Sequence, residues 1–198
     1  IVGAITAQHH REMIERYGQP MLKEFPGQVS QFALIGLGKL GGAELGYHGD
    51  LDLVLIYEGD GTSAHRKGST NKKTLTNFEF FTELVQRVIK TCGLTAAGKL
   101  YTIDLRLRPT GRSGSVVSPL FRFENYYREN AALWERQVLT RGLIIHGSSE
   151  FTKRIEAAIL EAIVGHDWSI HDAQEIQSMR NRLEESRPAT DIKRGRGG

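Results

Sequence analysis

The sequence predicts an α+β fold in which a small mixed sheet is followed by a helical bundle. Three observations indicate this fold. Two short apolar runs with strand character lie in the first third of the chain, a long amphipathic helix separates them from a third, alternating run, and helical periodicity dominates after residue 118. We therefore expect two domains: residues 1–118 hold the sheet and an N-terminal helix, and residues 119–198 form a helical domain that is truncated at its C-terminus.

The first elements follow from local patterns. Residues 4–17 carry apolar side chains roughly on one helical face and are followed by Gly18, so we expect a helix that ends there. Residues 32–35 and Asp50–Tyr57 are apolar runs of strand length, which predicts two buried strands. Residues 59–73 are polar and glycine-bearing, which is typical of a loop.

A helix and a third strand are expected next. Thr76 and Glu79 have the spacing of a capping box, which opens a helix. The helix is expected to bury Phe78 among other apolar residues and to end at Gly93. Residues 99–108 alternate strictly between apolar and polar side chains, which predicts a strand with one buried face.

The remainder of the chain reads as helical. Ser118 and Pro119 form a good N-cap and first-turn pair, so a helix is expected to begin there and to pack Trp134 into the core. Two more helices are expected at about 151–163 and 170–186.

Composition and charge narrow the classes of protein. Apolar residues make up 39% and charged residues 25% of the chain, as in ordinary globular domains. No apolar run is long enough to cross a membrane, the net charge of +3 is small, and the basic residues are not gathered on one helix. We therefore expect no membrane and no nucleic acid as partner. The single Cys92 excludes an internal disulfide and predicts a buried thiol in a reducing, cytoplasmic setting.

The glycines after the first strand invite a comparison with nucleotide-binding motifs. Gly36, Gly38 and Gly41 have the spacing of the dinucleotide fingerprint, but too few residues follow them for a full helix before the next strand. The P-loop pattern also fails, because Leu40 stands where Ser or Thr is required. What survives is a tight turn whose backbone N–H groups and Lys39 bind a phosphate. The alternative is a turn with no ligand.

Two carboxylates open the second strand. Asp50 and Asp52 are two residues apart and so share a face, while the leucines between them face the core. Carboxylates this close repel each other unless divalent cations lie between them. A solvated surface is the alternative, but Val54 and Ile56 make the far half of this strand apolar on both faces, which favours a central strand.

The third strand carries a similar polar face. Asp104, Arg106 and Arg108 alternate with its apolar residues. If this strand pairs beside Asp50–Tyr57, Asp104 becomes a third carboxylate, and three oxygen donors suit octahedral Mg²⁺. The arginines would then bind phosphate oxygens or neutralise the acids, and local salt bridges are an equal alternative.

These motifs, taken in order, resemble those of the glutamine synthetase adenylyltransferase family and, more broadly, of polymerase-β-like nucleotidyltransferases. The resemblance runs from about residue 30 to the end of the chain. It rests on the segments Gly38–Leu45, Asp50–Asp52, Asp104–Pro109, Ser113–Gly114, Trp134–Glu135, Asp191–Lys193 and Gly197–Gly198. One departure stands out, because His48-Gly49 replaces the Ser-Ser that often precedes the acids in this family.

The resemblance implies a polymerase-β-like fold and roles for individual residues. Asp50, Asp52 and Asp104 would be the catalytic carboxylates and the metal ligands, for Mg²⁺ or Mn²⁺. The nucleotide, ATP, would be bound by Gly38, Lys39, Gly41, Arg106 and Arg108.

The resemblance also implies the reaction and its partners. AMP would be moved from ATP to a tyrosine hydroxyl of glutamine synthetase, with a PII-type signalling protein as a further partner. The family's polypeptide holds two related units, and the opposite unit removes AMP with phosphate. Residues 44–47 and 134–137 favour the adenylylating unit. A non-catalytic nucleotide-sensing module is the alternative from another class, and a DNA-binding domain is a distant third.

Overall fold

The computed structural model describes residues 1–44, 49–66, 68, 73–93, 102–104 and 115–185. The chain divides into two compact units, residues 1–165 and residues 166–198. The first unit contains the sheet and the predicted site. Within the described part of the second unit, residues 166–185, one helix is present.

The longer elements predicted before residue 105 are present, and two short strands that were not predicted, Gln19–Pro20 and Ser63–Ala64, lie among them. The helices are α1 (Val2–Tyr17), α2 (Gly38–Gly41), α3 (Asn77–Gly93), α4 (Leu120–Glu129), α5 (Leu133–Leu139), α6 (Ser149–Val164) and α7 (Ile170–Glu185). The strands are β1 (Gln19–Pro20), β2 (Phe32–Leu37), β3 (Asp50–Tyr57), β4 (Ser63–Ala64), β5 (Thr102–Asp104), β6 (Val117–Pro119) and β7 (Leu143–Gly147).

The main sheet is small and mixed, which confirms the predicted fold class. Its order is β5-β3-β2-β7, and β6 also pairs with β3. β2 runs antiparallel to both β3 and β7, whereas β5 and β6 run parallel to β3. β3 is therefore flanked on both edges, by β2 along one edge and by β5 and then β6 along the other, as expected for a central strand.

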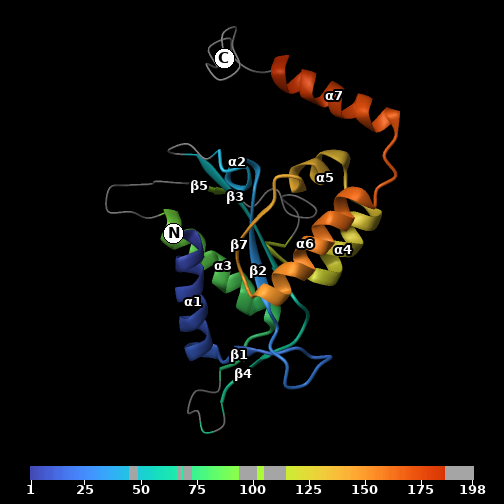
Figure 1. Ribbon diagram of the computed structural model, residues 1–198. Coiled ribbons are helices and arrows are strands. Elements are labelled where there is room, and N and C mark those ends of the chain that lie inside the picture. The colour runs from blue at the N-terminus through green and yellow to red at the C-terminus, as the bar shows by residue number, and fades with distance from the viewer. Residues whose placement is uncertain (45–48, 67, 69–72, 94–101, 105–114, 186–198) are drawn as a thin grey trace. The chain divides into compact units, whose positions relative to one another are not determined.

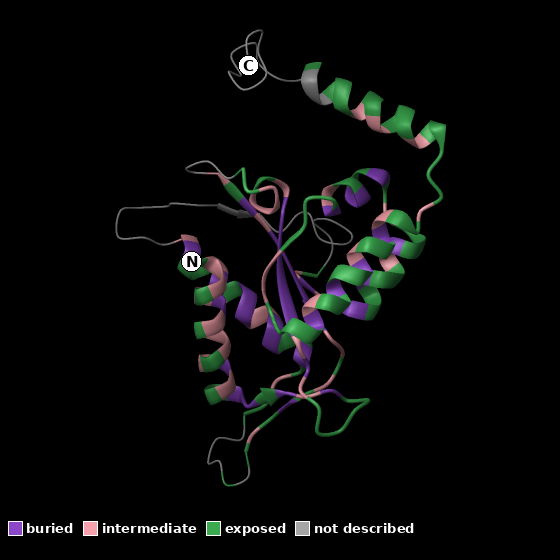
Figure 2. Cartoon of the chain, viewed as in Figure 1, coloured by how far each residue is buried: buried purple, intermediate pink, exposed green. Residues whose placement is uncertain are grey.

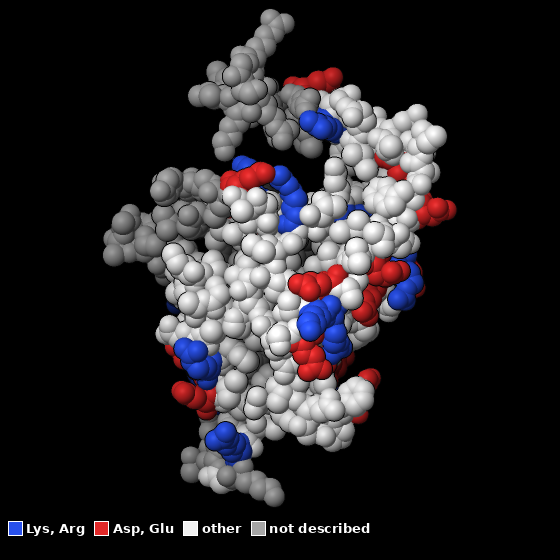
Figure 3. All heavy atoms as spheres, viewed as in Figure 1, with Lys and Arg blue, Asp and Glu red and all other residues white. Residues whose placement is uncertain are grey.

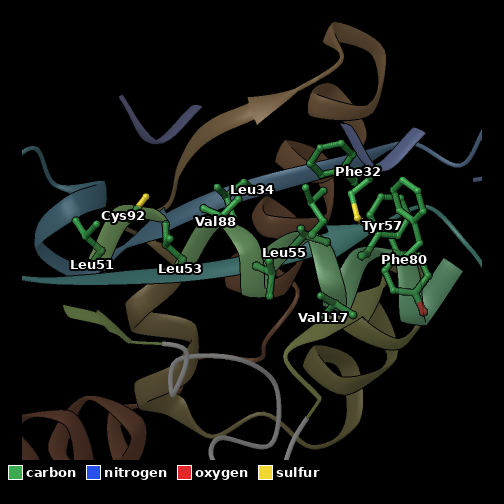
Figure 4. Close-up of a cluster of buried hydrophobic side chains, with 14 of the residues drawn as sticks. Phe32, Leu34, Leu51, Leu53, Leu55, Tyr57, Phe80, Val88, Cys92 and Val117 are labelled. Carbon is green, nitrogen blue, oxygen red and sulfur yellow. The ribbon is translucent and has the colours of Figure 1, made fainter. Parts of the chain in front are cut away.

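Helices cover both faces of the sheet (Figure 1), α1 and α3 on one face and α4 and α6 on the other. The alternation of β3 divides its side chains between the two cores. Leu51, Leu53 and Leu55 join the core under α1 and α3, which Figure 4 shows, and Val54 and Ile56 join the core under α4 and α6. Burial is accordingly continuous along β2 and most of β3 (Figure 2).

The capping box at the start of α3 is confirmed. The Glu79 carboxylate accepts a hydrogen bond from the Thr76 N–H at 2.9 Å, and the Thr76 hydroxyl accepts one from the Glu79 N–H at 3.2 Å. The predicted burial of Phe78 is wrong, because this side chain is 45% exposed while Phe80 and Phe81 are fully buried. Phe80 and Phe81 form the buried stripe of α3 together with Leu84 and Val88. This stripe passes one position away from Phe78.

Two expectations after residue 115 are also wrong. Ser118 and Pro119 end a strand that pairs with β3, and α4 begins at Leu120. Pro119 stands at the last ladder position, where its missing N–H costs least. The segment expected to be wholly helical contains β7, and Trp134 lies 37% exposed on α5 rather than in the core. The division into domains at residue 118 stays a prediction.

The molecular surface carries charges of both signs. Lys and Arg side chains lie among Asp and Glu side chains over the face drawn in Figure 3. Among the described residues, no helix is both long enough and apolar enough to cross a membrane. Cys92 is buried as predicted, and burial raises the pKa of its thiol.

A histidine packs α1 onto the sheet. The His10 ring makes edge contacts with Phe32 and Phe80, at centroid distances of 4.8 and 5.9 Å. Burial, reinforced by His146, lowers the pKa of His10 from 6.5 to about 4. The folded state therefore holds His10 neutral under conditions where the unfolded state would protonate it.

We expect acid to destabilise the chain through this residue. Above pH 6.5 the free energy of unfolding keeps the full contribution of the neutral His10. It falls as the pH drops from 6.5 towards 4, because in that range only the unfolded state takes up the proton. The loss should be on the order of 2 kcal/mol. Urea unfolding at pH 7, 5.5 and 4.5 measures it. His10→Phe should flatten the decline, whereas the exposed-site control His171→Gln should not, and equal slopes for the two variants would contradict the assignment.

Candidate functional site

The candidate site lies where β2 ends and β3 begins. β2 leads into the short helix α2, and β3 returns antiparallel, so that Leu37 pairs with Asp52. This antiparallel return brings the glycine turn and the start of β3 together. A Cβ built on Gly38 would lie 2.6 Å from Asp52 Oδ2, and Gly38 has a φ of +58°. Glycine is thus required at position 38 for its conformation and for the close approach of the carboxylate.

The acids lie at the open end of the sheet. Asp50 is exposed and Asp52 half-buried, on the same face of β3 as Val54 and Ile56. The residues of β3 beyond Asp52 are all buried, as the prediction of a central strand requires. The two carboxylates therefore mark the point where the covered part of the strand gives way to solvent.

The predicted pairing of the third strand is confirmed at the backbone. β5 runs parallel to β3, with Thr102 beside Asp50 and Asp104 beside Asp52. The three acidic positions therefore meet at one end of two adjacent strands. The rest of the predicted strand, including Arg106 and Arg108, lies outside the described residues.

The chemistry of these positions fits a hard divalent cation. Carboxylate oxygens are the ligands that Mg²⁺ and Mn²⁺ prefer, and glycine beside Asp52 keeps side-chain atoms away from the carboxylate. Among the side chains that the structure describes, no three acidic, histidine or cysteine residues converge on one point. Asp50 and Asp52 supply two carboxylates of the kind that such an ion binds, and position 104 is the neighbouring backbone position.

The glycine turn is held by its own backbone. The N–H of Gly42 donates to the carbonyl of Gly38 at 3.0 Å, and the N–H of Glu44 donates to the carbonyl of Lys39 at 2.8 Å. Lys39 is exposed in this turn. Gly41 has a packing reason to be glycine, since a Cβ there would lie 1.7 Å from the carbonyl oxygen of Arg141.

Arg141 contacts this turn, and the sequence alone did not place it there. Its Nη2 donates to Glu44 Oε1 at 2.6 Å across 97 positions of the chain. The sequence gives only a weak signal for this contact, because nothing in the spacing of residues 38–44 indicates that their partner follows α5.

A second arginine, Arg136 on α5, has a structural role. Arg136 is 5% exposed, and its guanidinium donates to the carbonyl of Ala162 at 2.5 Å and to the carbonyl of Tyr127. These carbonyls lie in the last turns of α6 and α4, where backbone acceptors lack helical partners and a positive charge is favoured. Beside it, the buried Glu135 accepts hydrogen bonds from the hydroxyl of Tyr126 at 2.7 and 2.8 Å.

The fold and the site together define an α+β domain with acids beside a glycine-lysine turn, the arrangement we expect of a nucleotidyl-transferring enzyme. The model of the family described as glutamate-ammonia ligase adenylyltransferase matches residues 1–158. The chain belongs to this family.

Curated relatives agree with the family model. A protein of Hahella chejuensis is 31% identical over 209 residues, covering 100% of this chain and 21% of that protein. Proteins of Methylococcus capsulatus and Pseudomonas putida are 37% and 36% identical, covering 92% and 94% of this chain and 20% and 18% of their own lengths. All three are named bifunctional glutamine synthetase adenylyltransferase/adenylyl-removing enzyme. The chain thus spans about a fifth of the length of these relatives.

Gly38→Ala should destabilise the chain more than a glycine substitution that meets backbone strain alone. The control is Gly27→Ala, because Gly27 has a φ of +90°, which strains alanine at least as much as +58° does, and no atom lies within 4 Å of an added Cβ. The control should cost about 1 kcal/mol, and Gly38→Ala about 1–2 kcal/mol more, since Asp52 must also move. Urea unfolding measures both, and equal losses would contradict the proposed close approach.

Arg136→Met should cost about 3 kcal/mol of unfolding free energy. It removes both hydrogen bonds and leaves two buried carbonyls at helix ends without a donor. The control is Arg128→Met, at an exposed arginine of α4 whose guanidinium donates to Asn125 Oδ1 at 3.0 Å, where a change within about 0.5 kcal/mol is expected. Chemical denaturation distinguishes the two, and similar small losses would rule out the capping role.

Proposed function

We propose that this chain is the catalytic unit of a metal-dependent nucleotidyltransferase that moves AMP from ATP to a tyrosine hydroxyl of glutamine synthetase. The observation that carries the proposal is the register of β3 and β5, which gathers positions 50, 52 and 104 beside the glycine turn. Membership of the family supports the reaction and the protein substrate.

The acids and the turn have complementary roles in this proposal. Asp50, Asp52 and Asp104 hold Mg²⁺ or Mn²⁺, which when bound supplies charge neutralisation for the polyphosphate and lowers the pKa of an attacking hydroxyl. Gly38 and Lys39 bind phosphate oxygens through backbone N–H groups and the ammonium charge. Gly41 keeps the turn in place, and Arg106 and Arg108 are assigned to the phosphates as well.

The reaction itself needs positioning more than covalent help. The tyrosine oxygen attacks the α-phosphorus of ATP, the bond to the bridging oxygen breaks, and pyrophosphate leaves with the electron pair. The tyrosine proton passes to a neighbouring carboxylate or to solvent, and Asp104 is the carboxylate we assign to it. Fixed donors and charges around the phosphates then supply most of the rate enhancement.

The opposite reaction is a second candidate, because the name of the relatives joins an adenylyltransferase to an adenylyl-removing enzyme. In that reaction inorganic phosphate attacks the phosphorus of adenylyl-tyrosine, the bond to the tyrosine oxygen breaks, and ADP and the free tyrosine hydroxyl are formed. Offering adenylylated glutamine synthetase with phosphate, and looking for ADP, separates the two units. A nucleotide-sensing module would bind ATP without either turnover, and the presence of all three acidic positions favours an enzyme. The PII-type partner and the cytoplasmic location stay predictions.

Asp50→Asn and Asp52→Asn should each lower AMP transfer at least about 100-fold in the full-length protein, because each removes a negative ligand from the cation. The measurement is Mg²⁺-dependent incorporation of labelled AMP into glutamine synthetase. Asp60→Asn is the matched control, an acid beyond the other end of β3 that contacts Tyr57 at 3.5 Å and should leave transfer unchanged. Full activity in both site variants would end the assignment.

A further inference from the structure

Arg141 touches the glycine turn with its backbone and with its side chain. It follows α5 and precedes β7, and its carbonyl oxygen occupies the space where a Cβ on Gly41 would stand. Its guanidinium carbon lies 3.4 Å from the position of a Cβ on Gly42. The same guanidinium donates to Glu44 Oε1 at 2.6 Å. Three residues of one turn thus contact a single residue from a distant part of the chain.

Hydrogen bonds connect the residues that Arg141 contacts to Gly38 and Lys39, which are assigned to the nucleotide. The N–H of Glu44 donates to the carbonyl of Lys39 at 2.8 Å, so the residue that Arg141 holds is the one that closes the turn. The N–H of Gly42, which lies under the guanidinium, donates to the carbonyl of Gly38 at 3.0 Å. Gly38 in turn lies against the Asp52 carboxylate. The chain of contacts therefore runs from Arg141 to the site without a break.

We propose that Arg141 is a positioning residue that fixes the 38–44 turn at the distance from Asp52 at which it binds the nucleotide phosphates. The inference rests on the proposed function and extends it to a residue that acts through its contacts with the turn. The side chains of Arg141 and Glu44 are 49% and 56% exposed. A pair this exposed adds little to global stability, so its effect falls on the local geometry of the turn.

The test uses the full-length protein with Arg141→Met, Glu44→Gln and the double variant. Each single change should raise the KM for ATP about threefold, a size typical of an exposed ion pair, with a smaller change in kcat. The double variant should be no worse than either single one, because both remove the same contact. The reversed pair, Arg141→Glu with Glu44→Arg, should recover part of the loss. Arg154→Met, which removes an arginine of similar exposure (47%) from its ion pair with Glu58 at the other end of β3, should leave the KM unchanged.

A second measurement does not depend on activity. Amide hydrogen exchange in residues 38–44 of the nucleotide-free protein should quicken in Arg141→Met and stay unchanged in Arg154→Met. Unchanged exchange, or faster exchange with an unchanged KM for ATP, would overturn the positioning role. If the unsubstituted protein transfers no AMP and releases no ADP, the proposed function fails instead, and the exchange result still decides whether Arg141 holds the turn.

Discussion

The fold and the candidate site both depend on β3, which contributes side chains to two hydrophobic cores and to the site. β3 sends alternate residues into the two helical layers, and this alternation continues through Asp50 and Asp52 until the covering ends. A shift of register by one residue would exchange the side chains of the two cores and turn Asp50 and Asp52 to the opposite face of the sheet, which the packing of both cores resists. The same burial that stabilises the sheet therefore fixes where the carboxylates stand.

The partners of β3 then assemble the rest of the site around these acids. β2 pairs antiparallel and delivers the glycine turn to Asp52, and β5 pairs parallel and delivers position 104 to the same end. At the edge of the sheet where β3 begins, an antiparallel neighbour has its last residues and a parallel neighbour has its first. A mixed sheet is thus a geometric requirement for joining a turn and a third acid at one point.

Sequence patterns predicted most of the main sheet but few of the contacts between segments that are distant along the chain. Strict alternation and leucine spacing located β3 and the pairing of β5, because those patterns record burial on each face. β7 was missed because it is a half-exposed strand, whose short apolar run is not distinct from a helix segment. The salt bridge of Arg141 with Glu44, and the hydrogen bonds of Arg136 to two helix ends, depend on tertiary contacts between distant segments, which no local pattern encodes.

The double cap made by Arg136 also bears on how the molecule opens. One guanidinium joins the ends of α4 and α6 from its place on α5. Fraying either end would strand a buried positive charge, so neither helix can loosen while the others stay intact. The three helices should therefore detach from the sheet as one cooperative unit.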